Sequence, residues 1–222
     1  MISTLRPAKF MVRLRNRQRR DRKVRPAPSR GRPALGQAEQ ITARIVDAAW
    51  AVLLESGPEL FALDRVASAA HASKQTIYAR FAGKPELLEA VLSARTGLLF
   101  ADFEEAAQSG PIETVITEVT RRSVNSLSAP EALMLERLID WIDRARPHGN
   151  LREAVYLDML ERLSGCLERA IAQGQLTIAD PGTAARFWLD GLIGHVRGLS
   201  RHDETLAQWP EIYARYFLRA IT

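Results

Sequence analysis

Residues 72–88 read ASKQTIYARFAGKPELL and carry the most informative pattern in the chain. Ile77 and Phe81 lie four residues apart, so they share one face of a helix while polar side chains occupy the other face. Gly83 and Pro85 separate this segment from the next one, since proline is tolerated in the first turn of a helix. The stretch therefore predicts a short helix with a buried face and an exposed polar face, followed by a longer, leucine-rich helix.

Upstream of this stretch, the apolar residues also recur at helical spacing. A long helix containing Ile41, Ile45 and Val52 ends at the Ser-Gly-Pro sequence of residues 56–58, and a short apolar segment follows before a break at residues 71–73. A long helix followed by two short helices and a tight turn has the layout of a helix-turn-helix. In that layout the second short helix lies in the major groove of DNA.

The outer face of the second short helix carries side chains that suit DNA. Gln bonds adenine through two hydrogen bonds and Thr bonds bases or contacts a thymine methyl group, so Gln75 and Thr76 are expected to read bases. Tyr78 and Lys84 suit phosphate oxygens, which position a protein on the duplex. The candidate DNA-binding residues of this region are Ser73, Lys74, Gln75, Thr76, Tyr78, Arg80 and Lys84. An ordinary solvated helix face is the alternative, because residues 37–84 hold as many acidic as basic side chains.

The formal net charge of +5 is unevenly distributed along the chain. Residues 1–36 hold 12 Lys and Arg residues against one acid, Asp21, whereas the remainder holds 19 basic and 25 acidic side chains. A basic segment with few apolar residues cannot fold alone, and its natural partner is a polyanion. We expect residues 1–36 to be a disordered arm that contacts nucleic acid. The alternatives are a solvated tail without function, a targeting segment, or a start placed upstream of the true one.

Taken together, residues 41–94 resemble the N-terminal domain of the TetR family of bacterial transcriptional regulators. That family shows a Ser-Lys-x-Thr-hydrophobic-Tyr recognition helix and a Lys just before a Leu-rich helix, and both are present in residues 73–88. The RGRP sequence at residues 30–33 resembles the arm that often precedes the domain. The resemblance implies that Arg30 and Arg32 contact the minor groove.

Several positions depart from the family pattern. Ala62 stands where a Thr or Ser often contacts a phosphate, His71 stands where Gly commonly forms the turn, and Gln75 replaces a frequent Gly. Histidine accepts a left-handed backbone better than most residues, so the turn is still expected. These departures leave the fold intact and make the DNA sequence that is recognised unpredictable.

The rest of the chain reads as helices separated by Gly, Pro and Ser, with no alternating strand pattern, so the sequence predicts an all-α protein of about nine helices. We expect a helix-turn-helix DNA-binding domain over residues 37–84. The resemblance implies a helical effector-binding and dimerisation domain over residues 85–222, whose last two helices, at 181–200 and 207–221, pair with their copies. The candidate dimer-interface residues are Trp188, Gly191, His195, Gly198, Tyr213 and Phe217. Intrachain packing of the same residues is the alternative.

A pocket for the effector is expected among the helices of the C-terminal half. Its candidate contacts are Phe103, Arg121, Trp141, Tyr156 and Trp188. Aromatic residues at helical spacing more often form an ordinary core, which is the alternative for each of them. The effector itself is a small molecule whose identity the sequence does not give.

Several function classes are excluded by what the sequence lacks. One cysteine, Cys166, cannot form a disulfide framework, and the residues around His195 and His202 do not form a complete set of metal ligands at a recognised spacing. No apolar run approaches the length of a membrane span, so we expect a cytoplasmic protein. No catalytic motif is present, so no enzyme and no cofactor are predicted.

The sequence therefore predicts a ligand-responsive repressor that binds a palindromic double-stranded operator as a homodimer. The alternative is an all-α protein–protein adaptor that has a basic tail and no specific DNA site.

Overall fold

The computed structural model describes residues 35–222 apart from 109, 147–149 and 199–207. The described residues form nine α-helices and no strand, which confirms the all-α prediction. The helices are α1 (Leu35–Ser56), α2 (Leu63–Ala69), α3 (Lys74–Tyr78), α4 (Lys84–Ala106), α5 (Ile112–Ser128), α6 (Pro130–Ala145), α7 (Leu151–Ala172), α8 (Pro181–Gly198) and α9 (Trp209–Ile221). No helix within these described ranges is both long enough and apolar enough to cross a membrane. Arg30 and Arg32 lie outside the described residues.

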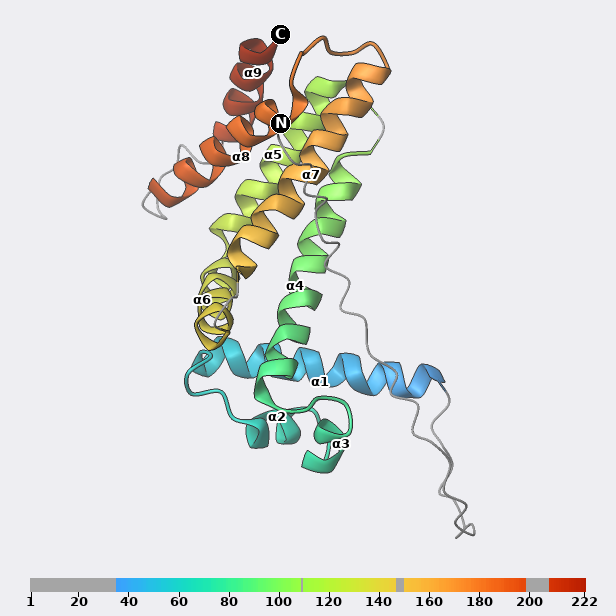
Figure 1. Cartoon of the computed structure of the whole chain (residues 1–222), viewed down its shortest axis with the longest axis vertical. Coiled ribbons are helices and arrows are strands. Elements are labelled where there is room, and N and C mark those ends of the chain that lie inside the picture. The colour runs from blue at the N-terminus through green and yellow to red at the C-terminus, as the bar shows by residue number, and fades with distance from the viewer. Residues whose placement is uncertain (1–34, 109, 147–149, 199–207) are drawn as a thin grey trace, which may run out of the picture.

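Helices α1, α2 and α3 lie together at one end of the long axis, and α8 and α9 lie toward the other end (Figure 1). Helix α4 begins beside α2 and α3 and runs along the long axis into the larger group of helices. Helices α5, α6 and α7 complete that larger group. The segment predicted to contact DNA is therefore far from the last two helices.

Two hydrophobic clusters hold these helices together. The first joins buried residues of α1–α3 to the first half of α4 and to one face of α6, which contributes Met134, Leu138, Ile139 and Ile142. The second joins the end of α4 to α5, α7, α8 and α9. Full burial of one such aliphatic side chain contributes about 1.5–3 kcal/mol, so each cluster is a substantial core. The four α6 residues make α6 part of the core beneath α1–α3.

The turn between α2 and α3 is built from a helix stop followed directly by a helix start. His71 has a left-handed φ of 47°, the N–H of His71 donates to Ser68 O, and the N–H of Ala72 donates to Ala67 O. This hydrogen-bond pair is the Schellman ending of a helix, in which a left-handed residue is required. Ser73 then caps α3, because its hydroxyl oxygen accepts from the N–H of Thr76 at 3.0 Å.

Candidate nucleic-acid interface and ligand cavity

Helix α3 has one face buried in the protein and one face exposed. Ile77 is completely buried and Phe81 is 6% exposed, so both hold α3 against the first hydrophobic cluster. Ser73, Lys74, Gln75 and Tyr78 are exposed, and Tyr78 keeps 56% of its surface accessible. The split between faces confirms the predicted burial of Ile77 and Phe81. The exposed residues lie at the end of the molecule that carries α1–α3 (Figure 1).

Lys74 is paired with a carboxylate from the preceding helix. Its ammonium lies 2.5 Å from Asp64 Oδ1, and both side chains are more than half exposed. The hydrogen bond to Asp64 raises the pKa of Lys74, so the ammonium stays charged. Asp64 lies on α2, ten positions before Lys74 on α3. Helical periodicity relates residues of one helix only, so the sequence did not reveal this pair.

Thr76 and Arg80 are half-buried and bonded within the same turn. The Thr76 hydroxyl lies 2.8 Å from the Ser73 hydroxyl, and Arg80 Nη1 donates to Thr76 O at 3.1 Å. These bonds fix the side chains near α3. Base reading by Gln75 and Thr76 and phosphate binding by Tyr78 stay predictions.

Lys84 makes its contacts within the protein. Its Nζ donates to Pro58 O at 2.7 Å and lies 4.8 Å from the centre of the Trp141 ring and 5.8 Å from that of Phe61. Desolvation by burial lowers the pKa of Lys84. A phosphate contact by Lys84 stays a prediction, and it requires the ammonium to turn away from these partners.

A cavity of about 600 Å³ lies among α4, α5, α6, α7 and α8. Its volume falls within the range of small-molecule sites, about 300–1,000 Å³. Phe103, Tyr156 and Trp188, three of the predicted ligand contacts, line it. Arg121 and Trp141 are outside the lining, since Arg121 points to α9 and Trp141 packs against Lys84. Ligand binding by these residues stays a prediction.

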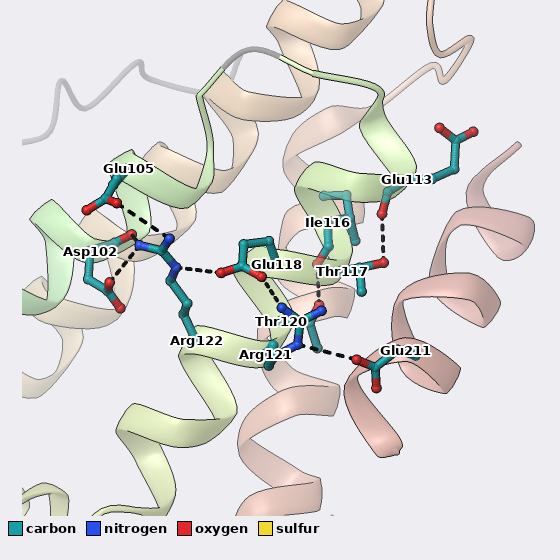
Figure 2. Close-up of polar contacts among 10 residues, drawn as sticks. All are labelled: Asp102, Glu105, Glu113, Ile116, Thr117, Glu118, Thr120, Arg121, Arg122 and Glu211. Carbon is teal, nitrogen blue, oxygen red and sulfur yellow. Dashed lines mark hydrogen bonds and ion pairs between the residues drawn. The ribbon is translucent and has the colours of Figure 1, made fainter. Parts of the chain in front are cut away.

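Arg122, which lines the cavity, lies in an ion-pair cluster between α4 and α5 (Figure 2). Its guanidinium donates to Glu118 Oε1 at 2.7 Å and to Asp102 Oδ1 at 2.8 Å, and lies 3.6 Å from Glu105. The hydrogen bonds to Glu118 and Asp102 raise the pKa of Arg122 above its ordinary value. This cation is therefore already neutralised by carboxylates.

Arg121, the neighbouring residue on α5, points in a different direction. It donates to Glu211 on α9 at 3.3 Å and also bonds Glu118 (Figure 2). Successive residues on a helix differ by about 100° because a turn holds 3.6 residues, so adjacent arginines face different neighbours. Arg121 therefore links α5 to α9.

Two hydrogen bonds connect α8 to the other walls of the cavity. The Tyr156 hydroxyl donates to Asp190 Oδ1 at 2.6 Å, and the fully buried Trp188 donates through Nε1 to Thr120 Oγ1 at 3.1 Å. Desolvation and the bond to Asp190 raise the pKa of Tyr156, so its hydroxyl stays protonated. Asp190 had no distinguishing pattern in the sequence, because its role depends on a partner 34 residues away.

The predicted dimer-interface residues are largely packed within their own chain. Trp188 and Phe217 are 0% and 1% exposed, and a Cβ added at Gly191 would lie 2.3 Å from the Tyr213 hydroxyl. His195 stacks on the Trp209 ring at 3.7 Å. These contacts are those of intrachain packing, the alternative, and pairing of these residues with a second copy stays a prediction. Gly198 has no neighbouring side chain within 4 Å of an added Cβ.

The last two helices also carry apolar side chains that stay accessible. Phe187 on α8 is 58% exposed, and Ile212 and Tyr216 on α9 are 39% and 63% exposed. Sequence periodicity did not separate these residues from their buried neighbours, because both helices are apolar on more than one side.

Within the part of the chain that the structure describes, no three His, Cys, Asp or Glu side chains are grouped as metal ligands. Cys166 is buried, and desolvation raises the pKa of its thiol, which disfavours the thiolate.

Comparison with known sequences finds the tetR family in the region that contains α2, α3 and the start of α4. Residues 45–91 match the family model for bacterial regulatory proteins of the tetR family. The chain is 42% identical over 60 residues to the DNA-binding transcriptional repressor TetR of Mycobacteroides abscessus, a match that covers 27% of this chain and 32% of that relative. It is 27% identical over 149 residues to the HTH-type transcriptional regulator SrpR of Pseudomonas putida, covering 66% of this chain and 68% of the relative.

Comparison with solved structures extends the similarity of fold to most of the chain. A protein described as a tetR-family transcriptional regulator from Mesorhizobium loti superposes with a TM-score of 0.69 at 22% identity, covering 83% of this chain and 98% of that chain. The regulator FadR from Bacillus subtilis, solved in complex with stearoyl-CoA, superposes with a TM-score of 0.60 at 17% identity, covering 81% and 99%. The helical arrangement is thus shared beyond the region of sequence similarity.

Proposed function

Because the chain belongs to the tetR family of bacterial regulatory proteins, we propose that it is a repressor that binds a palindromic DNA operator as a homodimer and responds to a small molecule. The observation that carries the proposal is the exposed polar face of α3, which is held outward by the buried Ile77 and Phe81. A helix supported in this way presents its side chains to the major groove without unfolding.

The exposed face of α3 supplies the groups that DNA binding needs. Gln75 and Tyr78 are exposed, and Lys74 adds a positive charge that Asp64 partly compensates. A single short helix buries too little surface for tight binding, so the basic arm of residues 1–36 adds salt-dependent affinity. Arg30 or Arg32 of that arm contacts the minor groove in this proposal.

The exposed apolar residues of α8 and α9 support assembly into a homodimer. Phe187 and Tyr216 are each more than half exposed, and a large exposed apolar patch on a soluble protein usually marks an interaction surface. Two copies that pair through α8 and α9 form a four-helix interface with twofold symmetry. Twofold symmetry places two copies of α3 in successive major grooves, about one DNA turn apart.

Helix α6 provides a physical connection between the cavity and the DNA-binding end. Ile139 belongs to the core beneath α1–α3 and also lines the cavity, while Leu138 is fully buried in that core. A ligand that displaces α6 therefore also displaces the unit that carries α3. Such a ligand lowers DNA affinity only if it binds the displaced state more tightly than the DNA-competent state. FadR of Bacillus subtilis, whose structure holds stearoyl-CoA, is a precedent for a ligand in this fold.

The proposal is tested by titrating the full chain against random duplex DNA at several salt concentrations. A regulator binds with a steep negative dependence on salt and retains a preference for particular sequences. An adaptor without a specific site shows no sequence preference, and that outcome would refute the proposal.

The dimer is tested separately by light scattering after size exclusion. Tyr216→Asp introduces a charge on the exposed face of α9 and is expected to convert the dimer to a monomer. Leu133→Asp, at a 49% exposed position on α6, is the matched control and leaves the mass unchanged. A wild-type protein that elutes as a monomer at high micromolar concentration would contradict the dimer.

A further inference from the structure

The cavity wall carries more acidic than basic side chains. The carboxylates are Asp102, Glu136, Glu153 and Asp190, and the guanidinium groups are Arg122, Arg152 and Arg197. Acidic groups therefore exceed basic groups on the wall itself. The balance that a bound molecule would meet depends on which of these groups already have partners.

Each guanidinium on the wall is engaged by at least one carboxylate. Arg122 is held by Asp102, Glu105 and Glu118, as Figure 2 shows. Arg152 bonds Asp140 at 2.8 Å. Arg197 bonds Glu136 at 3.0 Å. Every guanidinium on the wall therefore already shares its charge with a carboxylate, and Arg152 and Arg197 each use one nitrogen to do so.

Two carboxylates on the wall are left without an ion pair among the described residues. Asp190 accepts a hydrogen bond from the Tyr156 hydroxyl at 2.6 Å, and Glu153 accepts one from the Asn150 amide. Arg186, which lies outside the lining, donates to the Tyr156 hydroxyl at 3.5 Å. Asp190 therefore lines the cavity without an ion-pair partner of its own among the described residues.

Most of the remaining wall is apolar, and it includes several aromatic rings. Phe100, Phe103, Tyr156 and Trp188 all line the cavity. Aromatic faces attract cations, and two of these rings already have an arginine close by: Arg162 lies 4.3 Å from the centre of Phe100 and Arg186 lies 5.7 Å from that of Tyr156. The cavity therefore combines an apolar body with negative charge and aromatic surface.

We propose that this cavity binds lipophilic organic cations, with Asp190 as the counter-ion and the aromatic rings of the wall around the apolar body of the ligand. An anionic amphiphile meets Asp190 and Glu153 and has no unpaired guanidinium to bond. The proposal rests on the proposed function only in placing the effector in this cavity, because ligand binding is measured without DNA.

The experiment compares tetraphenylphosphonium with tetraphenylborate, two ions of nearly the same size and shape that carry opposite charges. Binding of each ion to the full-length protein is measured by isothermal titration calorimetry. Tetraphenylphosphonium is expected to bind saturably and more tightly than tetraphenylborate. Asp190→Asn, which keeps the side-chain shape and removes the charge, is expected to weaken tetraphenylphosphonium binding by about three- to tenfold, as loss of one partly solvated counter-ion predicts.

The matched control is Glu161→Gln, which removes an exposed carboxylate of the same helix as Tyr156 outside the lining and should leave both affinities unchanged. Ser126→Phe, which places a large ring on the wall, should abolish binding of both ions. The proposal is overturned if tetraphenylborate binds as tightly as the cation, if Asp190→Asn leaves the cation affinity unchanged, or if the cation shows no saturable binding. If the cation binds but does not weaken DNA affinity, the proposal that a ligand in this cavity releases the repressor from DNA is refuted. The proposal that the cavity binds lipophilic cations then still stands.

Discussion

The ammonium nitrogen of Lys84, at the start of α4, lies 4.8 Å from the centre of the Trp141 ring on α6. The same nitrogen donates to the carbonyl oxygen of Pro58, in the loop after α1. One side chain therefore ties the loop after α1, the start of α4 and helix α6 together. Helix α6 also contributes residues to the cavity lining and to the core beneath α1–α3.

Removing the Lys84 charge should destabilise the protein. Lys84→Met keeps most of the aliphatic stem and loses the bond to Pro58 and the contact with Trp141, which should lower the free energy of unfolding by about 1–3 kcal/mol. Urea denaturation followed by circular dichroism measures the change. Lys74→Met, at an exposed lysine paired only with Asp64, is the control and should leave the midpoint unchanged. Equal midpoints for both variants would show that the Lys84 contacts do not stabilise the fold.

Tyr78→Ala should weaken DNA binding to a similar extent on every sequence, because a phosphate contact carries no base information. Tyr78 is 56% exposed, so stability should change by no more than about 0.5 kcal/mol. Binding to several unrelated duplexes, measured by fluorescence anisotropy, checks this. A loss confined to one duplex would mean that Tyr78 reads a base.

Gln75→Ala should instead change the preference at a particular base pair, at a cost of about 1–3 kcal/mol on the preferred base. Gln75 lies on the exposed face of α3, so the fold should be retained. Affinities for operator variants with single base changes measure the effect. An unaltered preference profile would count against base reading at this position.

The helix-turn-helix could be predicted in detail because its signals are local. The left-handed residue that ends α2 and the hydroxyl that caps α3 are neighbours in sequence, and His71 and Ser73 occupy those positions in the structure. Ile77 and Phe81 are both buried, as their spacing of four residues indicated, although α3 ends at Tyr78 and Phe81 follows the helix. Local chemistry therefore determined both the turn and the inward face of α3.

The long-range contacts could not be predicted, because periodicity gives the face of a helix and not its neighbour. Arg121 and Arg122 are adjacent, yet only Arg122 lines the cavity, since α4 lies on its side and α9 lies on the side of Arg121. Lys84 suited a phosphate by its type and position, and in the structure it contacts Trp141, which is 57 residues away in sequence. The packing of Gly191 likewise required knowledge of where Tyr213 lies.

Gly191→Ala should destabilise the packing of α9 on α8. The added Cβ would lie 2.3 Å from the Tyr213 hydroxyl, which donates to Trp188 O at 2.7 Å and cannot move without losing that bond. Overpacking of this kind costs about 1–3 kcal/mol. The control is Gly97→Ala on α4. A Cβ added at Gly97 would meet no other part of the protein within 4 Å, so this substitution should stabilise its helix by up to about 1 kcal/mol. Thermal unfolding of both variants decides the question, and an unchanged transition for Gly191→Ala would contradict tight packing at this glycine.

Deletion of residues 1–36 should lower DNA affinity and flatten its dependence on salt, because each lysine or arginine that leaves a phosphate reduces the slope of log affinity against log salt by about 0.9. Twelve basic residues lie in this segment, so we expect the slope to fall by several units. Equilibrium binding at four salt concentrations measures the slope for the full and shortened chains. The same slope for both chains would mean that the segment does not contact DNA.

The central claim is that two symmetric copies of this chain read DNA through α3. Selection of bound duplexes from a random pool by the full-length protein tests it most directly, because one measurement reports binding, symmetry and spacing. We expect enrichment of an inverted repeat whose half-sites are centred about one DNA turn apart, roughly 10 base pairs. A pool that yields no enriched sequence, or a single half-site without its inverted copy, would contradict it.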